Sequence, residues 1–392
     1  MIKRVHILEL RSVRGTGGGP EKTILLGAQR SDPRVAVTVC YIRDTSDAAF
    51  GVAERAGVLG SEYVEVAERG SFDPRIWGAL RRIVRERGID IVHAHDYKTD
   101  LLALMLGAAE GIQPLATAHG WTGHSARERM FYYPLDKRVL RYFPVTIAVS
   151  SEIRRELLRC GAHPDRVRVV LNGIDQNVFR HRPGLERPAR AQMGLSPDDV
   201  VIGAVGRLEP QKRFDLLIRA CGELYRRMPS LRLVIVGSGS AGEELQAVAR
   251  ESLPRHAYRL LPHRTDVDVL HHGFDLFVQS SDYEGTPNAV LEAMALETPI
   301  VATAAGGTTD ILEHELEGTI VPTGDVGALV AAMEHALADR ERTRRQVQHA
   351  RRRVETTLSF AARMRTVENI YLELAARGRP GIQPPAAAEE CA

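Results

Sequence analysis

The hydrophobic and polar positions of this chain follow two alternating patterns along most of its length. In one pattern, a short apolar run has the length of a buried strand. In the other, apolar residues recur every three or four positions, the spacing of one helix face. This alternation favours parallel sheets wound by helices. The expected strands are residues 5–10, 35–41, 89–93, 114–117, 146–149 and 167–171, then 200–205, 231–236, 275–278, 299–302 and 320–321.

The domain organisation follows from the length and from a break in this pattern. A chain of 392 residues exceeds one ordinary hydrophobic core, and an apolar-poor stretch rich in Pro and Arg lies near its middle. We expect an α/β protein in which two Rossmann-like domains face each other across a cleft. The expected parts are a first domain over residues 1–180, a linker over 181–198, a second domain over 199–355, a helix over 356–376 that packs back on the first domain, and a disordered tail over 377–392.

The composition excludes several classes of protein. With 44% hydrophobic and 26% charged residues it is that of a soluble globular protein, and a formal net charge of +2 gives no overall case for nucleic acid binding. The four cysteines are far apart in the sequence, which excludes a CxxC metal site and argues against a disulfide framework. The apolar run near residue 1 is too short for a typical signal peptide and no uncharged run reaches roughly 18 residues, so we expect a cytoplasmic protein.

The stretch over residues 280–294 carries the strongest candidate chemistry. It joins an expected strand to an expected helix that begins near Pro287 and Asn288, which are residue types favoured at helix starts. Glu284 lies in the loop, and Glu292 lies about one turn into the helix. In an open α/β sheet such a loop lies at the carboxyl edge of the strands, where ligands bind. We interpret it as a loop that binds a polyhydroxylated, phosphorylated ligand.

Two further loops carry groups that suit an anion. After an expected strand, Arg207 and Lys212 place two cations five residues apart, which suits a diphosphate; a salt-bridged surface loop is the alternative. The glycine-rich loop over residues 15–19 leads into a helix, whose backbone amides could approach an anion. Pro20 and Glu21 stand where dinucleotide and P-loop motifs need glycine, so a plain mobile turn is the alternative there.

Three histidines follow strands. His119 ends an apolar strand just before a glycine, where a side chain enters a cleft. His93 and His95 end another strand, and we expect them to point to opposite faces, one of them as a structural residue. None of the three has a partner at the spacing of metal ligands, so no metal site is expected.

Between residues 121 and 143, basic residues are interleaved with aromatic ones. The basic residues are Arg127, Arg129, Lys137, Arg138 and Arg141. This segment could contact anionic lipid head groups at the inner face of the cell membrane. A solvated helix face whose aromatic side chains lie in the core is the alternative, and both stay open.

Taken in order, these motifs resemble those of the retaining GT-B glycosyltransferases of family 4 (glycosyl transferases group 1). The segment from Glu284 to Glu292 resembles the family's E-x7-E motif, and Gly206-Arg-Leu with Lys212 matches its diphosphate pair. Gly17-Gly-Gly-Pro-Glu21 resembles its N-terminal glycine loop. The resemblance extends from the first strand to about residue 375.

The resemblance implies a role for each matching residue. Glu292 would hold the ribose hydroxyls of a nucleoside diphosphate, and Glu284 would hold a hydroxyl of the donor sugar. Arg207 and Lys212 would stabilise the leaving diphosphate without a metal, and His119 would lie near the sugar and the acceptor. The remaining donor contacts that the resemblance implies are Gly18, Gly19, Gly285, Thr286, Pro287 and Asn288.

The function implied is transfer of a sugar from a nucleoside-diphosphate-sugar donor to a saccharide or lipid-linked acceptor, with retention of configuration. UDP or GDP is the expected nucleotide, no cofactor is expected, and cell-surface polysaccharide or glycolipid synthesis is the expected setting. Pro262 and Thr309-Asp310 depart from the residues common in the family, which weakens any inference about the base and the sugar. A nucleotide-sugar epimerase on the same scaffold and a binding protein without turnover are the alternatives.

Overall fold

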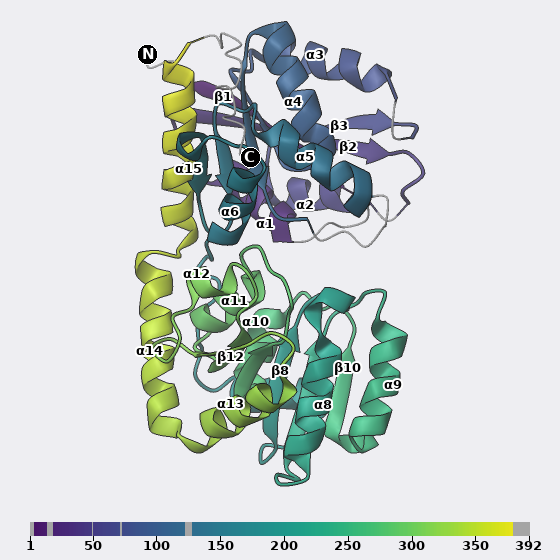
Figure 1. Ribbon diagram of the computed structural model, residues 1–392, viewed down its shortest axis with the longest axis vertical. Coiled ribbons are helices and arrows are strands. Elements are labelled where there is room, and N and C mark those ends of the chain that lie inside the picture. Colours follow the sequence, from purple (N-terminus) through teal and green to yellow (C-terminus); the bar gives the residue numbers. More distant parts are fainter. Residues whose placement is uncertain (1–3, 14–18, 49, 71–72, 122–127, 379–392) are drawn as a thin grey trace, which may run out of the picture. The chain divides into compact units, whose positions relative to one another are not determined.

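The structure, a computed structural model, describes residues 4–13, 19–48, 50–70, 73–121 and 128–378. These residues form two compact units (Figure 1). The first unit comprises the chain up to Val170 together with the stretch from Arg363 onward, and the second comprises Leu171–Ala362. Each unit is a parallel sheet with helices on both faces, which confirms the expected α/β fold class.

The first unit is built on a seven-stranded sheet in the order β3-β2-β1-β4-β5-β6-β7. Its strands are β1 (Val5–Ser12), β2 (Val35–Asp44), β3 (Tyr63–Glu68), β4 (Ile91–Ala94), β5 (Gln113–Ala118), β6 (Thr146–Ala148) and β7 (Val167–Val169). Its helices are α1 (Gly19–Gln29), α2 (Val52–Leu59), α3 (Arg75–Arg87), α4 (Tyr97–Glu110), η1 (Glu128–Tyr132), α5 (Tyr133–Leu140), α6 (Ser151–Arg159) and α15 (Phe360–Ala376).

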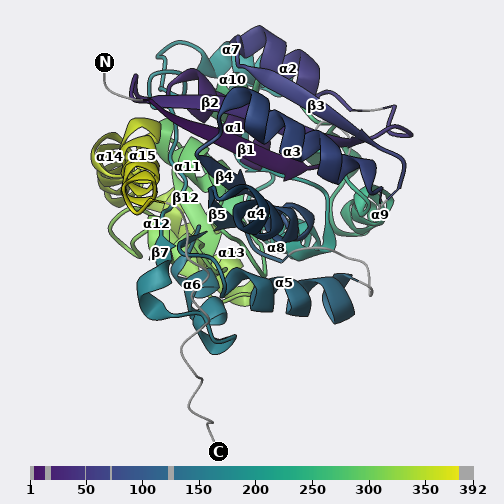
Figure 2. The same cartoon turned by 90° about the horizontal axis from the view of Figure 1, so that it is seen from above.

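Alternate residues of β1 explain why helices cover both faces of this sheet. Leu8 and Leu10 pack in a core with α3, α4 and α6, whereas Ile7 packs in another core with Ile370 and Leu374 of α15. Successive side chains of a strand point to opposite faces, so a strand buried on both sides reads as one apolar run. The helix α15, yellow in Figures 1 and 2, therefore joins the two ends of the chain in one unit.

The second unit is built on a six-stranded sheet in the order β10-β9-β8-β11-β12-β13. Its strands are β8 (Val200–Val205), β9 (Leu231–Val236), β10 (Tyr258–Leu261), β11 (Leu276–Gln279), β12 (Ile300–Thr303) and β13 (Thr319–Val321). Its helices are α7 (Glu186–Gln192), α8 (Phe214–Tyr225), α9 (Gly242–Ser252), α10 (Val267–Leu270), α11 (Asn288–Ala295), α12 (Thr308–Ile311), α13 (Val326–Ala338) and α14 (Arg340–Thr356).

The strand orders place a topological switch point in each unit. In the first unit the chain turns from one side of the sheet to the other between β1 and β4, and in the second unit it does so between β8 and β11. The loops that leave the carboxyl ends of such a pair run in opposite directions, which opens a crevice where ligands bind. Predicted site residues follow β1, β8 and β11, and His119 follows β5, the strand next to β4.

The structure adds two edge strands and one helix to the sequence-based expectation. Neither β3 nor β10 was expected, because both are short and only partly buried, so their apolar runs are weak. Within the stretch expected to be a linker, α7 buries Ala189, and Met193 after it joins a core of the second unit. Beyond residue 378 the expected disordered tail lies outside the described residues.

Candidate active site

The loop between β11 and α11 is held by an ion pair with the loop that follows β8. Glu284 is buried, and its Oε1 accepts hydrogen bonds from Lys212 Nζ at 2.6 Å and from Ser281 Oγ at 2.6 Å. Because β8 and β11 are neighbours in the sheet, the loops that leave them meet at one edge. The structure thus brings together two of the predicted residues from positions 72 apart in the chain.

Pro287 and Asn288, two more of the predicted residues, line a small cavity together with this pair. Thr286 Oγ1 accepts from the backbone N–H of Asn172 at 3.3 Å, and the Asn172 side chain donates to Asn288 Oδ1 at 3.2 Å. Pro287 caps α11, on which Glu292 is buried. The backbone N–H of Gly307, from the double glycine after β12, donates to the Glu284 carbonyl at 3.1 Å. Asn172 is therefore a site residue for which no role was predicted from the sequence.

Arg207 differs from Lys212 because its side chain is exposed. No hydrogen bond or ion pair joins the Arg207 guanidinium to any of the described residues, so the second predicted cation is available to an anionic ligand. Gly285 lies half-buried in the same unit, in the loop that carries Glu284.

A glycine turn after β9 supports the loop that carries these cations. Leu208 donates its backbone N–H to the Ser238 carbonyl at 3.0 Å, and a Cβ atom added to Gly237 would lie 1.8 Å from the Gly206 carbonyl oxygen. A Cβ atom added to Gly239 would lie 2.4 Å from the Leu208 carbonyl oxygen. Only glycine allows the two backbones to approach this closely, so the turn fixes the path of the loop.

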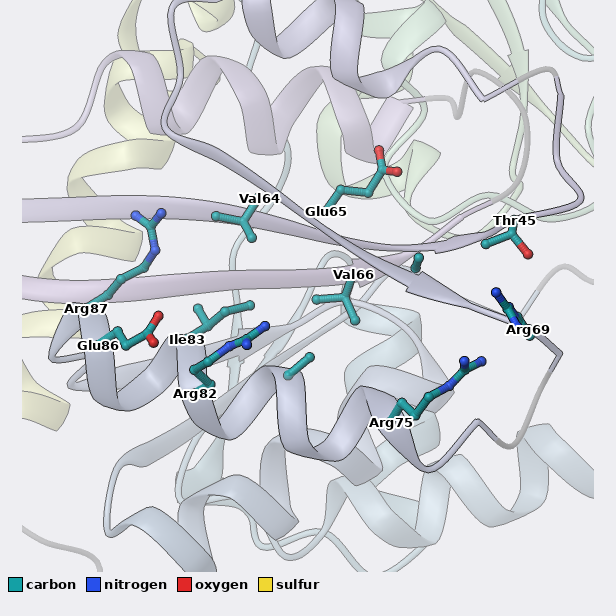
Figure 3. A pocket seen from close by; sticks show the side chains of 12 residues that line it. Thr45, Val64, Glu65, Val66, Arg69, Arg75, Arg82, Ile83, Glu86 and Arg87 are labelled. Atoms are coloured by element: carbon teal, nitrogen blue, oxygen red, sulfur yellow. The ribbon is translucent and has the colours of Figure 1, made fainter.

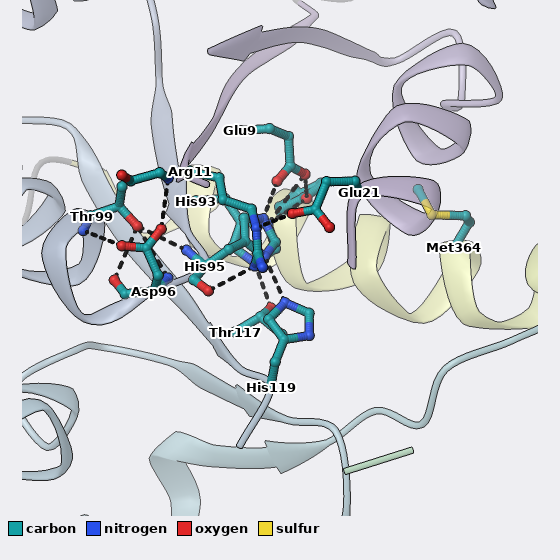
Figure 4. A network of polar contacts seen from close by, with 12 residues as sticks. Glu9, Arg11, Glu21, His93, His95, Asp96, Thr99, Thr117, His119 and Met364 are labelled. Atoms are coloured by element: carbon teal, nitrogen blue, oxygen red, sulfur yellow. Dashed lines mark hydrogen bonds and ion pairs between the residues drawn. The ribbon is translucent and has the colours of Figure 1, made fainter. Parts of the chain in front are cut away.

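The first unit holds a network of buried polar side chains at its switch point (Figure 4). Glu9 of β1 and His93 of β4 are paired in the sheet, and His95 follows β4. His95 Nε2 lies 2.5 Å from Glu9 Oε2, and His95 Nδ1 lies 3.1 Å from His119 Nε2. Tyr371 of α15 donates its hydroxyl to Glu9 Oε1 at 2.6 Å and lies 2.8 Å from His93 Nδ1.

The expectation that His93 and His95 point to opposite faces is wrong. Residues two apart on a strand share a face, and both rings contact Glu9. His93 is the structural residue, since its Nε2 also lies 2.7 Å from the hydroxyl of Thr117. Glu9 was not predicted as a site residue, although a single carboxylate inside an apolar strand signals a buried partner.

Burial and charge together set the protonation states in this network. Burial by itself would raise the pKa of Glu9, but the adjacent His93 and His95 hold it well below its usual value. Burial lowers the pKa of His95 to about 4, and burial together with the nearby Arg11 guanidinium lowers the pKa of His119 well below its usual value. At neutral pH Glu9 is therefore a carboxylate, and His95 and His119 are uncharged.

Among the residues that the structure describes, Glu9, His93 and His95 form a group that could hold a metal ion. One carboxylate oxygen and one nitrogen of each ring all lie within 4.8 Å of one another, which corrects the expectation that these histidines lack partners at ligand spacing. The 2.5 Å between His95 Nε2 and Glu9 Oε2 is a hydrogen-bond distance. Ligands that each stand about 2.0–2.2 Å from a tetrahedral zinc ion lie further apart, so this pair suits a hydrogen bond and not a shared zinc ion.

Two predicted residues belong to the glycine-rich loop of the first unit. Gly18 lies outside the described residues, and Gly19 begins α1. Near this helix start Glu21 is buried, and its Oε1 lies 2.5 Å from Arg11 Nε. Contact of this loop with a diphosphate stays a prediction.

A cavity also lies elsewhere in the first unit, between β3 and α3 (Figure 3). It measures about 600 Å³, and Arg69, Arg75, Arg82 and Arg87 line it. None of the predicted site residues lines this cavity. The candidate site therefore rests on the chemistry of its residues and not on cavity size.

Two family models match the chain. Residues 17–178 match the model described as Glycosyltransferase Family 4, and residues 186–353 match the model described as Glycosyl transferases group 1. The chain belongs to this family of GT-B glycosyltransferases. The family that the sequence motifs resemble is thereby confirmed.

Relatives and solved structures agree with this assignment. The glycosyltransferase is 29% identical over 317 residues to the putative glycosyltransferase EpsD of Bacillus subtilis, an alignment that covers 77% of this chain and 81% of that protein. It is 30% identical over 301 residues to the D-inositol 3-phosphate glycosyltransferase of Mycobacterium tuberculosis, which covers 72% of this chain and 57% of that protein. The crystal structure of Anabaena Alr3699/HepE in complex with UDP-glucose matches with a TM-score of 0.82 at 19% identity, over 94% of this chain and 100% of that one.

Proposed function

We propose that this glycosyltransferase moves a sugar from a nucleoside-diphosphate-sugar donor to a saccharide or lipid-linked acceptor, with retention of configuration and without a metal. The observation that carries the proposal is the meeting of Lys212 with Glu284 at the switch point of the second unit. A fixed cation stabilises the charge that develops on a leaving diphosphate, and the carboxylate beside it would hold a hydroxyl of the donor sugar. The exposed Arg207 would supply the second cation.

The division of roles among the charged groups supports transfer. Lys212 is already paired, so it is positioned before a ligand arrives, whereas Arg207 can close over the diphosphate and fork across two of its oxygens. Glu292 is buried on α11 and would hold the ribose hydroxyls, as the family resemblance implies. UDP and UDP-glucose occupy the similar Anabaena protein, which supports UDP as the first nucleotide to test.

A donor panel tests the proposal. The protein is incubated with UDP-, GDP- and ADP-sugars, and nucleotide release is followed with and without sugar or lipid acceptors. Release of the nucleoside diphosphate that depends on acceptor supports transfer, and the anomeric configuration of the product tests retention. Isomerised donor without release would instead indicate an epimerase, and binding alone would indicate a protein without turnover. A mock preparation from cells that carry the empty vector is the blank, because release that it shows comes from a contaminant.

We infer in addition that an apolar patch on the first unit contacts an anionic membrane. A lipid-linked acceptor would lie in that membrane, as expected for an enzyme of cell-surface polysaccharide or glycolipid synthesis. The patch consists of Tyr97, Leu101, Met105, Met130, Phe131 and Leu135, which are between 39% and 67% exposed. Stacking of Tyr97 on Tyr132, with ring centroids 5.2 Å apart, joins α4 to η1. Exposed Arg138 lies one turn after Leu135, so charge complementarity favours an anionic surface.

The described residues of the basic and aromatic segment over 121–143 lie partly in the core and partly on the surface. Phe143 is fully buried and Trp121 donates to Asp136 Oδ2 at 2.9 Å, whereas Phe131 is 65% exposed. Arg127 and the side chain of Arg129 lie outside the described residues. Among the residues that the structure describes, no helix combines the length and the apolar character needed to cross a bilayer.

Flotation with vesicles tests the membrane contact. The protein should float with vesicles of phosphatidylcholine and phosphatidylglycerol and stay behind with phosphatidylcholine alone. Leu135→Glu, which puts a negative charge in the patch, should abolish flotation. Val58→Glu is the matched control, because Val58 is 83% exposed on α2 and lies outside the patch. Equal flotation of wild type and Leu135→Glu would refute the assignment.

A further inference from the structure

We propose that Glu9 and His95 are positioning residues that fix the tautomer of His119, leaving its Nδ1 as a hydrogen-bond acceptor for a hydroxyl of the bound saccharide. The inference deepens the proposed function and rests on it, because His119 takes its place beside the sugar from the family resemblance. Glu9 and His95 would act only through His119.

Three side chains form the row that carries this inference (Figure 4). Glu9 comes from the interior strand β1, His95 follows β4 and His119 follows β5, so three adjacent strands present them at one edge. The contacts run from Glu9 Oε2 to His95 Nε2 at 2.5 Å and from His95 Nδ1 to His119 Nε2 at 3.1 Å. The rings of His95 and His119 lie 5.4 Å apart with an angle of 29° between their planes.

The placement of protons along this row follows from what each group can donate. An ionised carboxylate only accepts, so the proton of His95 lies on Nε2. An uncharged imidazole carries one proton, which leaves His95 Nδ1 as an acceptor. His119 Nε2 must then donate, and His119 Nδ1 is left with a lone pair. The directions of the pKa shifts of Glu9, His95 and His119 agree with these charge states.

The carboxylate at the start of the row is held on both sides. Tyr371 donates its hydroxyl to Glu9 Oε1 at 2.6 Å, so Oε2 is kept toward His95. The Tyr371 hydroxyl comes from α15, 362 residues later in the chain, and both Glu9 and Tyr371 are buried. A fully bonded carboxylate cannot exchange its partner for water at low cost, which makes the tautomer of His95 a fixed property of the fold.

Comparison of two histidines separates a structural role from a positioning role. Both ring nitrogens of buried His93 have partners, Tyr371 and Thr117, as expected for a core residue. His119 is only half-buried, and none of the described residues bonds its Nδ1. In Figure 4 this second nitrogen faces away from the network. A lone pair presented in this way suits a hydroxyl donor such as a sugar.

Nuclear magnetic resonance of histidine labelled with ¹⁵N reads the tautomer directly, and the signals of His119 are assigned from the spectrum of His119→Gln. The wild type should show His119 protonated on Nε2 and not on Nδ1. In Glu9→Gln the amide can keep its oxygen on Tyr371 and turn its N–H toward His95, which reverses the tautomer of His95 and then that of His119. A wild-type His119 protonated on Nδ1 would overturn the proposal even if Glu9→Gln failed to fold.

Kinetics distinguish positioning from simple structural support. With the donor that the panel identifies, Glu9→Gln should lower kcat by about 10–100-fold, the loss seen when the partner that orients a metal-bound histidine is removed, while UDP binding is unchanged. Thr117→Val is the matched control: it removes a buried hydroxyl from the His93 side of the network and should leave kcat and the His119 signals unchanged. Wild-type kcat in Glu9→Gln, or an equal loss in Thr117→Val, would also overturn the proposal. If no donor is turned over, the proposed function fails, and the tautomer still decides this inference.

Discussion

Substitution of Lys212 by Met tests the proposed transfer most directly, because the side chain has two separable effects. Its Nζ lies 2.6 Å from Glu284 Oε1, and the two side chains are 18% and 9% exposed. An exposed ion pair contributes about 0–1 kcal/mol, whereas removing one partner of a fully buried pair costs about 3–5 kcal/mol. Lys212 is partly exposed and Ser281 still donates to Glu284, so we expect a loss of about 1–2 kcal/mol.

That loss corresponds to a decrease in Tm of about 2–8 °C for a domain of this size. The effect on turnover should be larger, because the same cation would stabilise the charge that develops on the leaving diphosphate. Removal of one such group costs about 10²–10³-fold in kcat, and we expect that loss at temperatures where the variant is fully folded. Thermal unfolding and nucleotide release from the donor measure the two effects separately.

Lys98→Met is the matched control for this substitution. Lys98 pairs with Glu68, and these side chains are 19% and 9% exposed, so loss of the cation should cost a similar stability. Lys98 belongs to α4 of the first unit and has no proposed contact with the donor, so its kcat should be retained. Undiminished kcat in Lys212→Met would refute the diphosphate role, and an equal loss in both variants would trace the effect to stability alone.

Three further outcomes are expected. Gly237→Ala should displace the loop after β8, because its Cβ would lie 1.8 Å from the Gly206 carbonyl oxygen. We expect a loss of about 1–3 kcal/mol in the free energy of unfolding and weaker UDP binding in calorimetry. The control is Gly57→Ala, whose Cβ meets nothing within 4 Å and which should be neutral or stabilising. Burial lowers the pKa of His95 from 6.5 to about 4, so between these pH values the unfolded chain binds a proton that the folded chain does not. Acidification through this window should therefore lower the free energy of unfolding by roughly 3 kcal/mol. Chemical unfolding measured against pH should show this decrease in the wild type and not in His95→Phe. Dialysis against EDTA should leave nucleotide release unchanged, whereas activity lost and then restored by a divalent cation would contradict the metal-independent mechanism.

Much of the second unit could be predicted from the sequence, because the information is local. The loop that carries Glu284 lies between an apolar strand and a helix start, and strand patterns alone place Lys212 after β8. Parallel strands share one carboxyl edge, so residues after β8 and β11 meet without any knowledge of packing. The shape of the loop after β8 was not predictable. It depends on Gly237 and Gly239, which follow β9 and lie against the backbone of that loop.

In the first unit only the tertiary structure decided the candidate site. The sequence alone marked His119 as a residue near the cleft, but it assigned His93 and His95 to the wrong faces and overlooked Glu9. Glu9 lies 86 residues from His95 and 362 from Tyr371, so no local pattern connects them. They meet because β1 pairs with β4 in the sheet and α15 packs back on it. The protonation of each group depends on those neighbours and on burial, which are properties of the folded chain.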